Sequence, residues 1–269
     1  LKSLLIGSEG TLGMITAVRL RLLPAPEARA TLVVLLRDRA QGCAAMLEML
    51  AAGMQPSALE FLDGETLEIV AGSYPGAPAP REAGFALLIE VDGSRGETDA
   101  QRRALLKLLA EHAVAIEEPA DTGALWRWRD GFNPATAGVR GGKVSEDVAF
   151  PVERLGEGLA RFAEIAERQG LRSCAWGHGG EGNVHATVLV DPSSSRELEA
   201  ARTIGEELFA LVVELGGSVA AEHGVGRLKR GRLAQQWDEP AVALHDAIKR
   251  TFDPKDLFNP GVKSGTSGS

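Results

Sequence analysis

Cysteines are few in this sequence, and long apolar runs are missing. Cys43 and Cys174 are the only two cysteines and lie in unrelated contexts, so they predict neither a disulfide framework nor a thiolate metal site. This usage fits a reducing cytoplasm. No apolar run approaches the ~20 residues that a membrane-spanning helix needs. We therefore expect no transmembrane segment, and peripheral attachment to the inner membrane stays open.

The sequence also lacks an excess of basic residues. Its net charge is -8 at pH 7, and a nucleic-acid-binding face needs a cluster of Lys and Arg that outweighs nearby acids. The nearest cluster, residues 227–232, is short, and we interpret it as the solvated start of a helix. Attraction of an anion near a functional site is the alternative. We expect no nucleic-acid partner.

A starting methionine is absent, since the chain begins Leu1-Lys-Ser-Leu-Leu-Ile-Gly. This opening does not resemble a secretory signal. We expect the chain to be a segment cut from within a longer protein. Its 269 residues are enough for one large domain or two small ones, with ample length to bury a core.

Strand-length apolar runs alternate with segments of helical period. The expected strands are Ala30–Leu36, Ala58–Phe61, Phe85–Val91, Val114–Ile116, Val148–Phe150, Ser173–Trp176 and Val184–Val190. The expected helices are Arg39–Ala52, Glu97–Glu111, Val152–Gln169 and Arg196–Leu215. The order strand, helix, strand, strand, helix, strand occurs over residues 30–116 and again over residues 144–221. This order predicts an α+β fold, with ferredoxin-like units forming one mostly antiparallel sheet and helices on one face.

A glycine-rich stretch holds two histidines, His178 and His185, seven residues apart. Three glycines within this run of eight residues make a helix interior unfavourable. Apolar strands on either side of residues 179–183 predict a hairpin instead. The two histidines would face each other across the strand pair, with Cβ atoms roughly 5 Å apart. That spacing suits two ligands of one ion.

Glu222 and His223 follow a helical run that is expected to end at a glycine pair. Together with the two upstream histidines, Glu222 would complete a ligand set for a divalent metal. His223 would stand beside it as a spare base. The alternative is structural: the upstream histidines satisfy a tight turn, and Glu222 pairs with Arg227 or Lys229. We favour the metal because the ligand types occur together.

Four motifs resemble one known family. Leu5–Thr16 resembles the last segment of the FAD-binding domain in the family related to vanillyl-alcohol oxidase. The two histidine segments resemble the FAD-linked oxidase C-terminal domain, the cap of the D-2-hydroxyacid branch. That branch includes D-lactate dehydrogenases, the glycolate oxidase flavin subunit and D-2-hydroxyglutarate dehydrogenases. Leu125–Asp130 resembles the arginine-bearing segment of the family, and Phe252–Gly261 resembles its C-terminal signature.

The resemblance implies a division of the chain into four parts. These are residues 1–26 as the C-terminal remnant of the FAD-binding domain, 27–250 as a substrate- and metal-binding cap domain, 251–263 as a segment returning toward the FAD domain, and 264–269 as a flexible tail. The family's glycine-rich pyrophosphate-binding segment lies upstream of the motif at residues 7–13. This chain therefore holds at most the last piece of the flavin site. One departure is Glu181, where the family commonly has aspartate.

The implied reaction is oxidation of a D-2-hydroxy acid, of the lactate, glycolate or 2-hydroxyglutarate type, to the 2-oxo acid. Hydride would pass to flavin N5 while a metal assists loss of the hydroxyl proton. The implied cofactors are FAD and a divalent metal, zinc or manganese rather than iron. The implied residues are His178, His185 and Glu222 for the metal, His223 as the base, Arg129 and Lys143 for the substrate carboxylate, and Ser8, Glu9, Gly10, Gly13 and Asn259 for the flavin. Arg129 and Lys143 have an alternative interpretation as partners in surface ion pairs.

Two other functions stay open. The first is a metal-only enzyme such as a non-haem iron oxygenase, which also uses two histidines and a carboxylate. The second is a binding module in which the cap carries no chemistry. The flavin-domain remnant argues against the first, and the intact set of candidate residues argues against the second for the whole protein. The fragment alone is expected to be inactive. The electron acceptor is not predicted, and a homodimer stays open.

Overall fold

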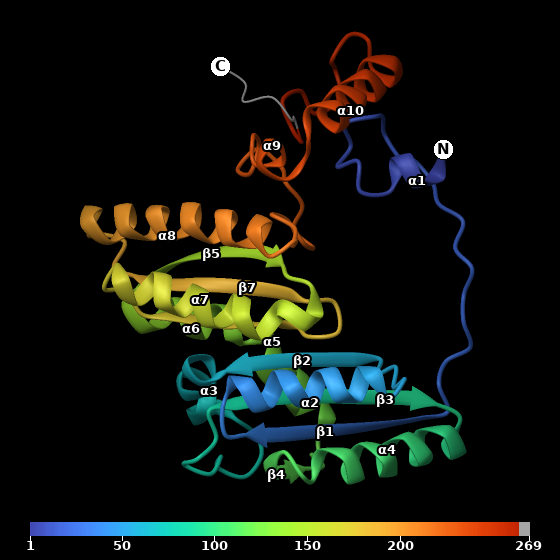
Figure 1. The fold of residues 1–269 in the computed structure, drawn as a ribbon. Coiled ribbons are helices and arrows are strands. Elements are labelled where there is room, and N and C mark those ends of the chain that lie inside the picture. The colour runs from blue at the N-terminus through green and yellow to red at the C-terminus, as the bar shows by residue number, and fades with distance from the viewer. Residues whose placement is uncertain (264–269) are drawn as a thin grey trace.

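The computed structural model describes residues 1–263, and a seven-stranded sheet forms its centre (Figure 1). The strands are β1 Ala28–Leu36, β2 Ala58–Asp63, β3 Phe85–Gly93, β4 Ala113–Glu117, β5 Gly142–Ala149, β6 Ser173–His178 and β7 Asn183–Val190. Their order across the sheet is β4-β1-β3-β2-β6-β7-β5, and each pair of neighbours is antiparallel. The predicted α+β class and the single antiparallel sheet are confirmed. The tail at residues 264–269 lies outside the described residues.

Helices connect these strands. The α-helices are α1 Lys2–Leu5, α2 Arg39–Ala51, α3 Gly64–Val70, α4 Arg95–Leu109, α5 Thr122–Asp130, α6 Phe132–Arg140, α7 Leu155–Arg168, α8 Ser195–Glu214, α9 Leu233–Gln236 and α10 Glu239–Phe252. Two 3-10 turns are η1 Ala71–Ser73 and η2 Val152–Arg154. Among the helices of the described chain, none is both long enough and apolar enough to cross a bilayer.

The strand order contains the two predicted ferredoxin-like units. In the first, the strands lie in the order β4-β1-β3-β2, with α2 and α4 as the connections. The second unit repeats this plan with β5, α7, β6, β7 and α8, and its fourth strand is reduced to one bridge between Ala149 and Ser218. Pairing of β2 with β6 joins the two units into one sheet.

Side-chain caps fix where several helices begin. The Ser94 hydroxyl accepts a hydrogen bond from the backbone N–H of Glu97, whose carboxylate accepts one from the N–H of Ser94, and this capping box starts α4. Asp38 and Ser194 cap α2 and α8 by accepting from the N–H three residues later. Gly216, with φ of 77°, follows the end of α8 as a left-handed glycine.

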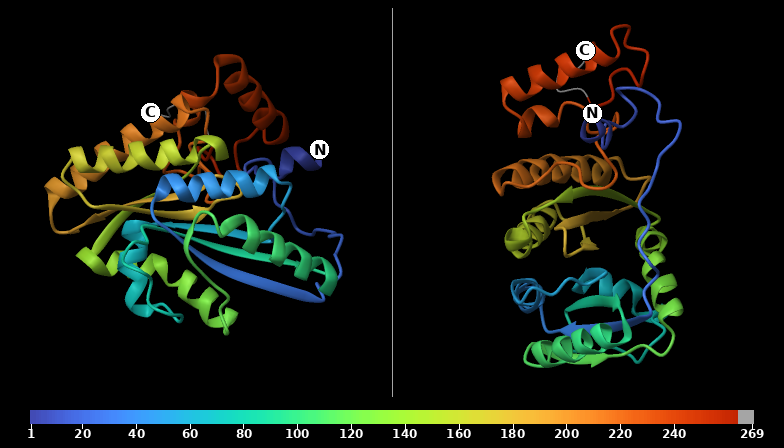
Figure 2. Two further views of the ribbon diagram at one scale, coloured as in Figure 1. Left: turned by 60° about the horizontal axis from the view of Figure 1, so that its bottom comes forward. Right: turned by 90° about the vertical axis from the view of Figure 1, so that its right-hand side faces the viewer.

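Both faces of the sheet are covered (Figure 2). The helices α2, α4, α7 and α8 pack on one face, over a core that includes Phe61, Phe85 and Phe162. The shorter helices α3, α5 and α6 cover part of the other face, where Trp128 and Phe132 are buried. The sequence predicts helices on one face only, and the structure adds this second layer. Coverage on both sides explains why β1 and β3 are apolar at consecutive positions instead of alternating.

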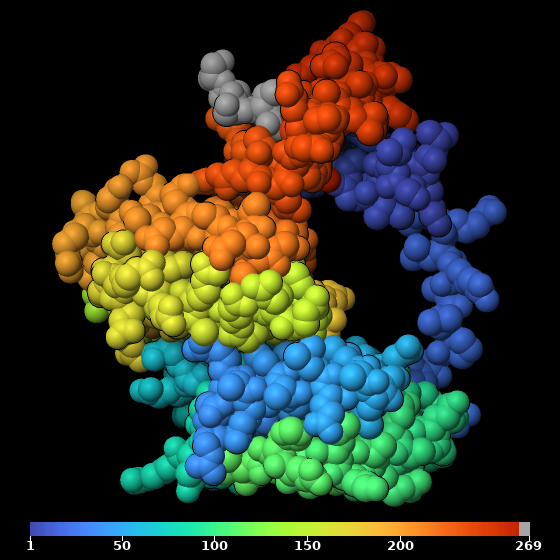
Figure 3. Space-filling model, viewed as in Figure 1, coloured from blue at the N-terminus to red at the C-terminus, as the bar shows by residue number. Residues whose placement is uncertain are grey.

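The two ends of the described chain lie together, beyond one side of the sheet (Figures 1 and 3). Residues 14–26 form an extended segment that leads from the N-terminal end to β1. Lys249 Nζ, on α10, donates to the carbonyl oxygen of Thr11 over 2.9 Å. Asn259 Nδ2 donates to the carbonyl oxygen of Glu9 over 2.7 Å. The first residues therefore pack against α10 and the segment that follows it.

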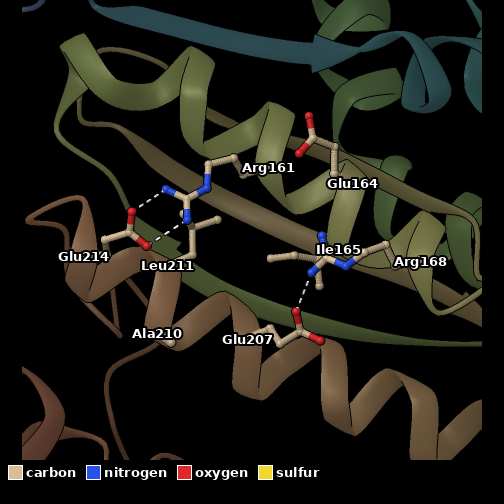
Figure 4. Close-up of a pocket in the computed structure, with 8 residues that line it drawn as sticks. All are labelled: Arg161, Glu164, Ile165, Arg168, Glu207, Ala210, Leu211 and Glu214. Carbon is tan, nitrogen blue, oxygen red and sulfur yellow. Dashed lines mark hydrogen bonds and ion pairs between the residues drawn. The ribbon is translucent and has the colours of Figure 1, made fainter.

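A groove runs between α7 and α8 on the solvent side of the long helices (Figure 4). Arg161 forms two hydrogen bonds to Glu214, of 2.6 and 2.7 Å. Arg168 lies 2.5 Å from Glu207. Exposed ion pairs of this kind contribute about 0–1 kcal/mol each. Since these cations already face carboxylates of the neighbouring helix, we assign the groove a role in joining α7 to α8.

Gly182 provides a test of the turn between β6 and β7. Its φ is 71°, and a Cβ atom there would overlap the carbonyl oxygen of Phe150. We expect Gly182→Ala to lower the free energy of unfolding by about 2–5 kcal/mol, from left-handed strain plus displaced backbone. Gly53→Ala is the control, because Gly53 has φ of 78° and open space around it; about 1–2 kcal/mol is expected. Chemical denaturation measures both losses, and equal losses would contradict the steric argument.

Candidate metal centre

Four neighbouring strands bring polar side chains to one end of the sheet face on which α5 packs. Glu60 pairs with His178, Trp176 pairs with His185, and His185 pairs with Asp147. Paired residues in an antiparallel sheet share a face. The side chains of Glu60, His178, His185 and Asp147 therefore follow one another across β2, β6, β7 and β5.

The β6–β7 hairpin forms as predicted, but the register expected for its histidines is wrong. His185 pairs with Trp176 and not with His178. The reason is the turn: β6 ends at His178, β7 begins at Asn183, and the residues between them close the hairpin through the left-handed Gly182. The shift is two residues, so both histidines keep the same face. Their rings approach diagonally, with centroids 5.9 Å apart.

Glu222 reaches this row of side chains from the loop after α8. Its Oε2 lies 3.3 Å from His178 Nε2, and its Oε1 lies 3.2 Å from His185 Nε2. The same Oε1 lies 3.5 Å from His223 Nε2. The rings of His185 and His223 stack with centroids 5.5 Å apart. The structure thus brings together the three residues predicted as metal ligands and the one predicted as the base.

The structural alternative for Glu222 included a pair with Lys229. Lys229 is directed elsewhere: its Nζ donates to the carbonyl oxygen of Val219 over 3.0 Å and to that of Asp147. Glu222 lies against imidazole nitrogens instead.

Glu60 fixes the orientation of His178. Its Oε1 lies 2.6 Å from His178 Nδ1, and its Oε2 accepts from Arg129 Nε and Nη2 over 3.0 and 2.7 Å. Burial raises the pKa of Glu60, but hydrogen bonds from His178 and Arg129 outweigh burial and leave the pKa below its usual value. Accepting this hydrogen bond, Glu60 in turn raises the pKa of His178. In the neutral ring the proton sits on Nδ1, and Nε2 is free toward Glu222.

His185 is nearly enclosed, with 8% of its surface exposed. Burial lowers the pKa of His185, which favours the neutral imidazole that metal binding requires. Ligand atoms about 2.0–2.1 Å from a tetrahedral zinc lie roughly 3.3 Å from one another. Each imidazole lies at this spacing from one oxygen of Glu222, His178 Nε2 at 3.3 Å from Oε2 and His185 Nε2 at 3.2 Å from Oε1. The donor set fits a divalent metal.

A second, overlapping set of donors lies in the same place. Ligand atoms of Asp147, His185, Glu222 and His223 lie within 4.8 Å of one another. Oδ1 of Asp147 is buried without a hydrogen-bond partner in the described structure and lies 3.9 Å from His185 Nδ1. Both sets contain His185 and Glu222, so these two residues are central to either arrangement.

Glu60 and Asp147 are absent from the residues that the sequence predicts for the site. Both are buried, with 7% and 3% of their surfaces exposed. Glu60 stands within an otherwise apolar strand segment, Ala58–Leu62, whereas Asp147 follows Ser145 and Glu146 in a polar part of β5. Carboxylates are rarely buried so deeply without a partner. A single acid within an apolar strand was therefore a signal that could have found Glu60, and no such signal marks Asp147.

The two predicted substrate cations lie on the same sheet face. Arg129, on α5, is half-buried and paired with Glu60, so its ion pair is not a surface one. Lys143 Nζ, on β5, lies 4.9 Å from the centre of the Trp176 ring. Burial lowers the pKa of Lys143. Since Trp176 pairs with His185, Lys143 is connected to the histidine row through that ring.

The residues predicted for the flavin come together from both ends of the chain. Ser8, Glu9, Gly10 and Gly13 form an irregular turn in which the last three have positive φ. The side chain of Asn259 contacts this turn, and a Cβ on Gly10 would lie 2.8 Å from Asn259 Nδ2. The turn and Asn259 are thus neighbours. Their role toward FAD stays a prediction.

Residues 25–262 match the family model described as FAD linked oxidases, C-terminal domain. The chain belongs to this family. It is 31% identical over 265 residues to the glycolate oxidase subunit GlcD of Bacillus subtilis (strain 168), covering 97% of this chain and 56% of that protein. It is 28% identical over 267 residues to the mitochondrial D-lactate dehydrogenase [cytochrome] of Arabidopsis thaliana, covering 97% and 47%. The predicted family and branch are confirmed, and the chain spans about half the length of the curated relatives it matches.

Two solved structures share the fold. One is p-cresol methylhydroxylase with substrate bound, with a TM-score of 0.68 and 16% identity, covering 90% of this chain and 54% of that one. The other is 4-ethylphenol oxidase from Gulosibacter chungangensis in its isoeugenol complex, with a TM-score of 0.68 and 15% identity, covering 91% and 55%. At this identity the likeness concerns the fold alone.

Metal analysis tests the ligand assignment. We expect about one equivalent of zinc or manganese to remain on the dialysed protein, and to be lost from His185→Ala and Glu222→Ala, because each change removes a donor. Elemental analysis by mass spectrometry measures the metal. His112→Ala and Glu181→Gln are the matched controls: His112 contacts Glu48 elsewhere on the surface, and Glu181 is exposed in the histidine turn. Metal retained by both site variants would contradict the assignment.

Proposed function

We propose that this chain is the substrate- and metal-binding cap of a flavoprotein that oxidises a D-2-hydroxy acid to the 2-oxo acid. The substrate is of the lactate, glycolate or 2-hydroxyglutarate type. The observation that carries the proposal is the convergence of His178, His185 and His223 on the carboxylate of Glu222. Relatives named as a glycolate oxidase subunit and a D-lactate dehydrogenase support this choice of substrate class.

The proposal gives each part of the chain a place in the longer protein. Residues 1–26 end the FAD-binding domain, residues 27–250 form the cap, and residues 251–263 return toward the FAD domain. Most of the flavin site belongs to a part of the protein outside this chain. The residues that would contribute to it from this chain are Ser8, Glu9, Gly10, Gly13 and Asn259.

His178, His185 and Glu222 would hold the metal, which is zinc or manganese in this proposal. When bound, the metal polarises the substrate hydroxyl and FAD accepts the hydride from Cα. Glu60 keeps Nδ1 of His178 protonated and so presents Nε2 to the ligand cluster. Burial of His185 favours its neutral form in the same way.

The remaining residues handle the proton and the substrate carboxylate. His223 takes the hydroxyl proton on Nε2, and its side chain, 66% exposed in this chain, can pass the proton on to solvent. Arg129 donates to Glu60 from Nε and Nη2, so its Nη1 is available for the carboxylate. Lys143 supplies a second cation on the same sheet face.

Flavin reduction tests the proposed reaction. The complete flavoprotein, loaded with FAD and with zinc or manganese, is mixed without oxygen with D-lactate, glycolate and D-2-hydroxyglutarate in turn. We expect at least one of these acids to bleach the flavin absorbance. Failure of all three, and of related 2-hydroxy acids, would contradict the proposal. Oxygen-dependent turnover by this chain with iron and without flavin would support the metal-only alternative.

His223→Asn separates proton transfer from metal binding. We expect the rate of flavin reduction to fall by about 10²–10⁴-fold, because the general base is lost, while the metal content stays near one equivalent. Stopped-flow absorbance measures the rate, and elemental analysis measures the metal. His112→Asn is the control for loss of a surface imidazole. A normal rate in His223→Asn would remove this residue from the mechanism.

A further inference from the structure

The loop that carries Glu222 and His223 is not part of a helix or a strand. Between the end of α8 and the start of α9, the described chain has one isolated bridge, at Ser218, and otherwise turns and bends. A loop without a regular hydrogen-bond ladder needs other partners for its backbone groups. In this loop two carboxylates accept hydrogen bonds from four backbone N–H groups, those of Ala221, His223, Val225 and Gly226.

Asp147, on β5, holds the first half of the loop. Its Oδ2 accepts from the N–H groups of Ala221 and His223 over 2.9 and 3.0 Å. Since Asp147 pairs with His185 in the sheet, these bonds tie the loop to the strand pair that carries one of the candidate ligands. Lys229 adds to the contact between the loop and β5, because its ammonium group donates to the carbonyl oxygens of Asp147 and Val219.

Glu9 holds the second half of the loop. Its Oε1 accepts from the N–H of Val225 over 2.9 Å, and its Oε2 accepts from the N–H of Gly226 over 2.7 Å. Gly224 allows this approach: its φ is 74°, and a Cβ there would lie 2.9 Å from Glu9 Oε1. Asn259 in turn holds the carbonyl oxygen of Glu9. The bonds of Glu9 thus connect the N-terminal segment with the loop.

We propose that Glu9 and Asp147 are positioning residues, which hold Glu222 and His223 in place through the backbone of their loop. Naming Glu222 a ligand and His223 a base rests on the proposed function. Hydrogen bonds from N–H groups to carboxylates are among the stronger ones. Removal of either carboxylate leaves two loop N–H groups without partners, so the Glu222 carboxylate is no longer held against His178 and His185. Glu9 therefore supports the metal centre without touching it.

Zinc affinity of the complete flavoprotein provides the first readout, measured by competition with a chromogenic chelator. Outer-shell partners typically change metal affinity by about 10–100-fold. We expect losses in this range for Glu9→Ala and Asp147→Ala. Glu9→Gln keeps one acceptor oxygen and is expected to fall between wild type and Glu9→Ala. Asp147→Asn keeps one oxygen that can accept from both N–H groups and is expected to stay close to wild type. If Asp147→Asn loses as much affinity as Asp147→Ala, Asp147 is not a positioning residue.

Lys249→Met is the control for docking of the N-terminal segment. Lys249 holds the carbonyl oxygen of Thr11 and does not contact the loop at residues 221–226 in the described structure. We expect a lower melting temperature but a zinc affinity within about threefold of wild type, since an outer-shell effect would be about 10-fold or more. If Lys249→Met weakens zinc binding as much as Glu9→Ala does, docking of the segment explains the effect, and the inference about Glu9 is wrong.

Amide hydrogen exchange in the metal-free protein gives a readout that depends on neither metal nor turnover. We expect exchange at Val225 and Gly226 to become at least about tenfold faster in Glu9→Ala, as expected when a protecting hydrogen bond is lost. Exchange at Ala221 and His223 should accelerate in Asp147→Ala. If the wild-type flavoprotein binds no zinc and reduces no flavin, the proposed function is wrong. The exchange rates then still test whether Glu9 and Asp147 position the loop. Unchanged exchange in Glu9→Ala would overturn the inference.

Discussion

A carboxylate buried in an apolar sheet needs hydrogen-bond donors, and His178 and Arg129 donate to the carboxylate of Glu60. Removing a carboxylate from water costs several kcal/mol, which only close, hydrogen-bonded partners offset. Glu60 therefore determines two positions at once. It turns Nε2 of His178 toward Glu222, and it draws the guanidinium of α5 to the same end of the sheet. The ligand cluster and the proposed substrate cation are adjacent because they share this carboxylate.

Glu60 lies where the two halves of the sheet meet, so its hydrogen bonds connect residues of both halves. Glu60 lies on β2 and pairs with His178 on β6, which is where the two ferredoxin-like units join. One unit supplies Glu60, and the other supplies His178 and His185. The site therefore depends on the pairing of β2 with β6. Either unit alone would hold an incomplete set of charges, with a buried acid or an imidazole left without its partner.

The histidine hairpin could be predicted from the sequence because glycines exclude a helix and apolar strands flank the turn. Its register could not, since the left-handed conformation of Gly182 and the position of β7 against β5 arise only in the assembled sheet. Glu60 and Asp147 were missed for a related reason. Glu60 is one acid in an apolar strand, Asp147 follows a second acid in a polar one, and only strand order reveals that both lie beside the histidines.

The prediction for Glu222 had a different basis. Its approach to the histidines was expected from ligand chemistry and from resemblance to a family, because no local pattern connects residue 222 with residues 178 and 185. The helices α5 and α6 escaped prediction, as their short sequences mix tryptophan, glycine and proline without a clear period. Glu9 was predicted for the flavin, which stays a prediction, and the sequence did not reveal that its carboxylate contacts the loop of His223.

We propose that the side chains converging on Glu222 form a metal site. Anomalous diffraction at the zinc edge, from crystals of the complete flavoprotein grown with zinc, tests it most directly. We expect one strong peak bonded to Nε2 of His178, Nε2 of His185 and the carboxylate of Glu222, at about 2.0–2.2 Å from each ligand atom. Absence of a peak there, or a peak bonded to Asp147 and His223 without His178, would contradict it.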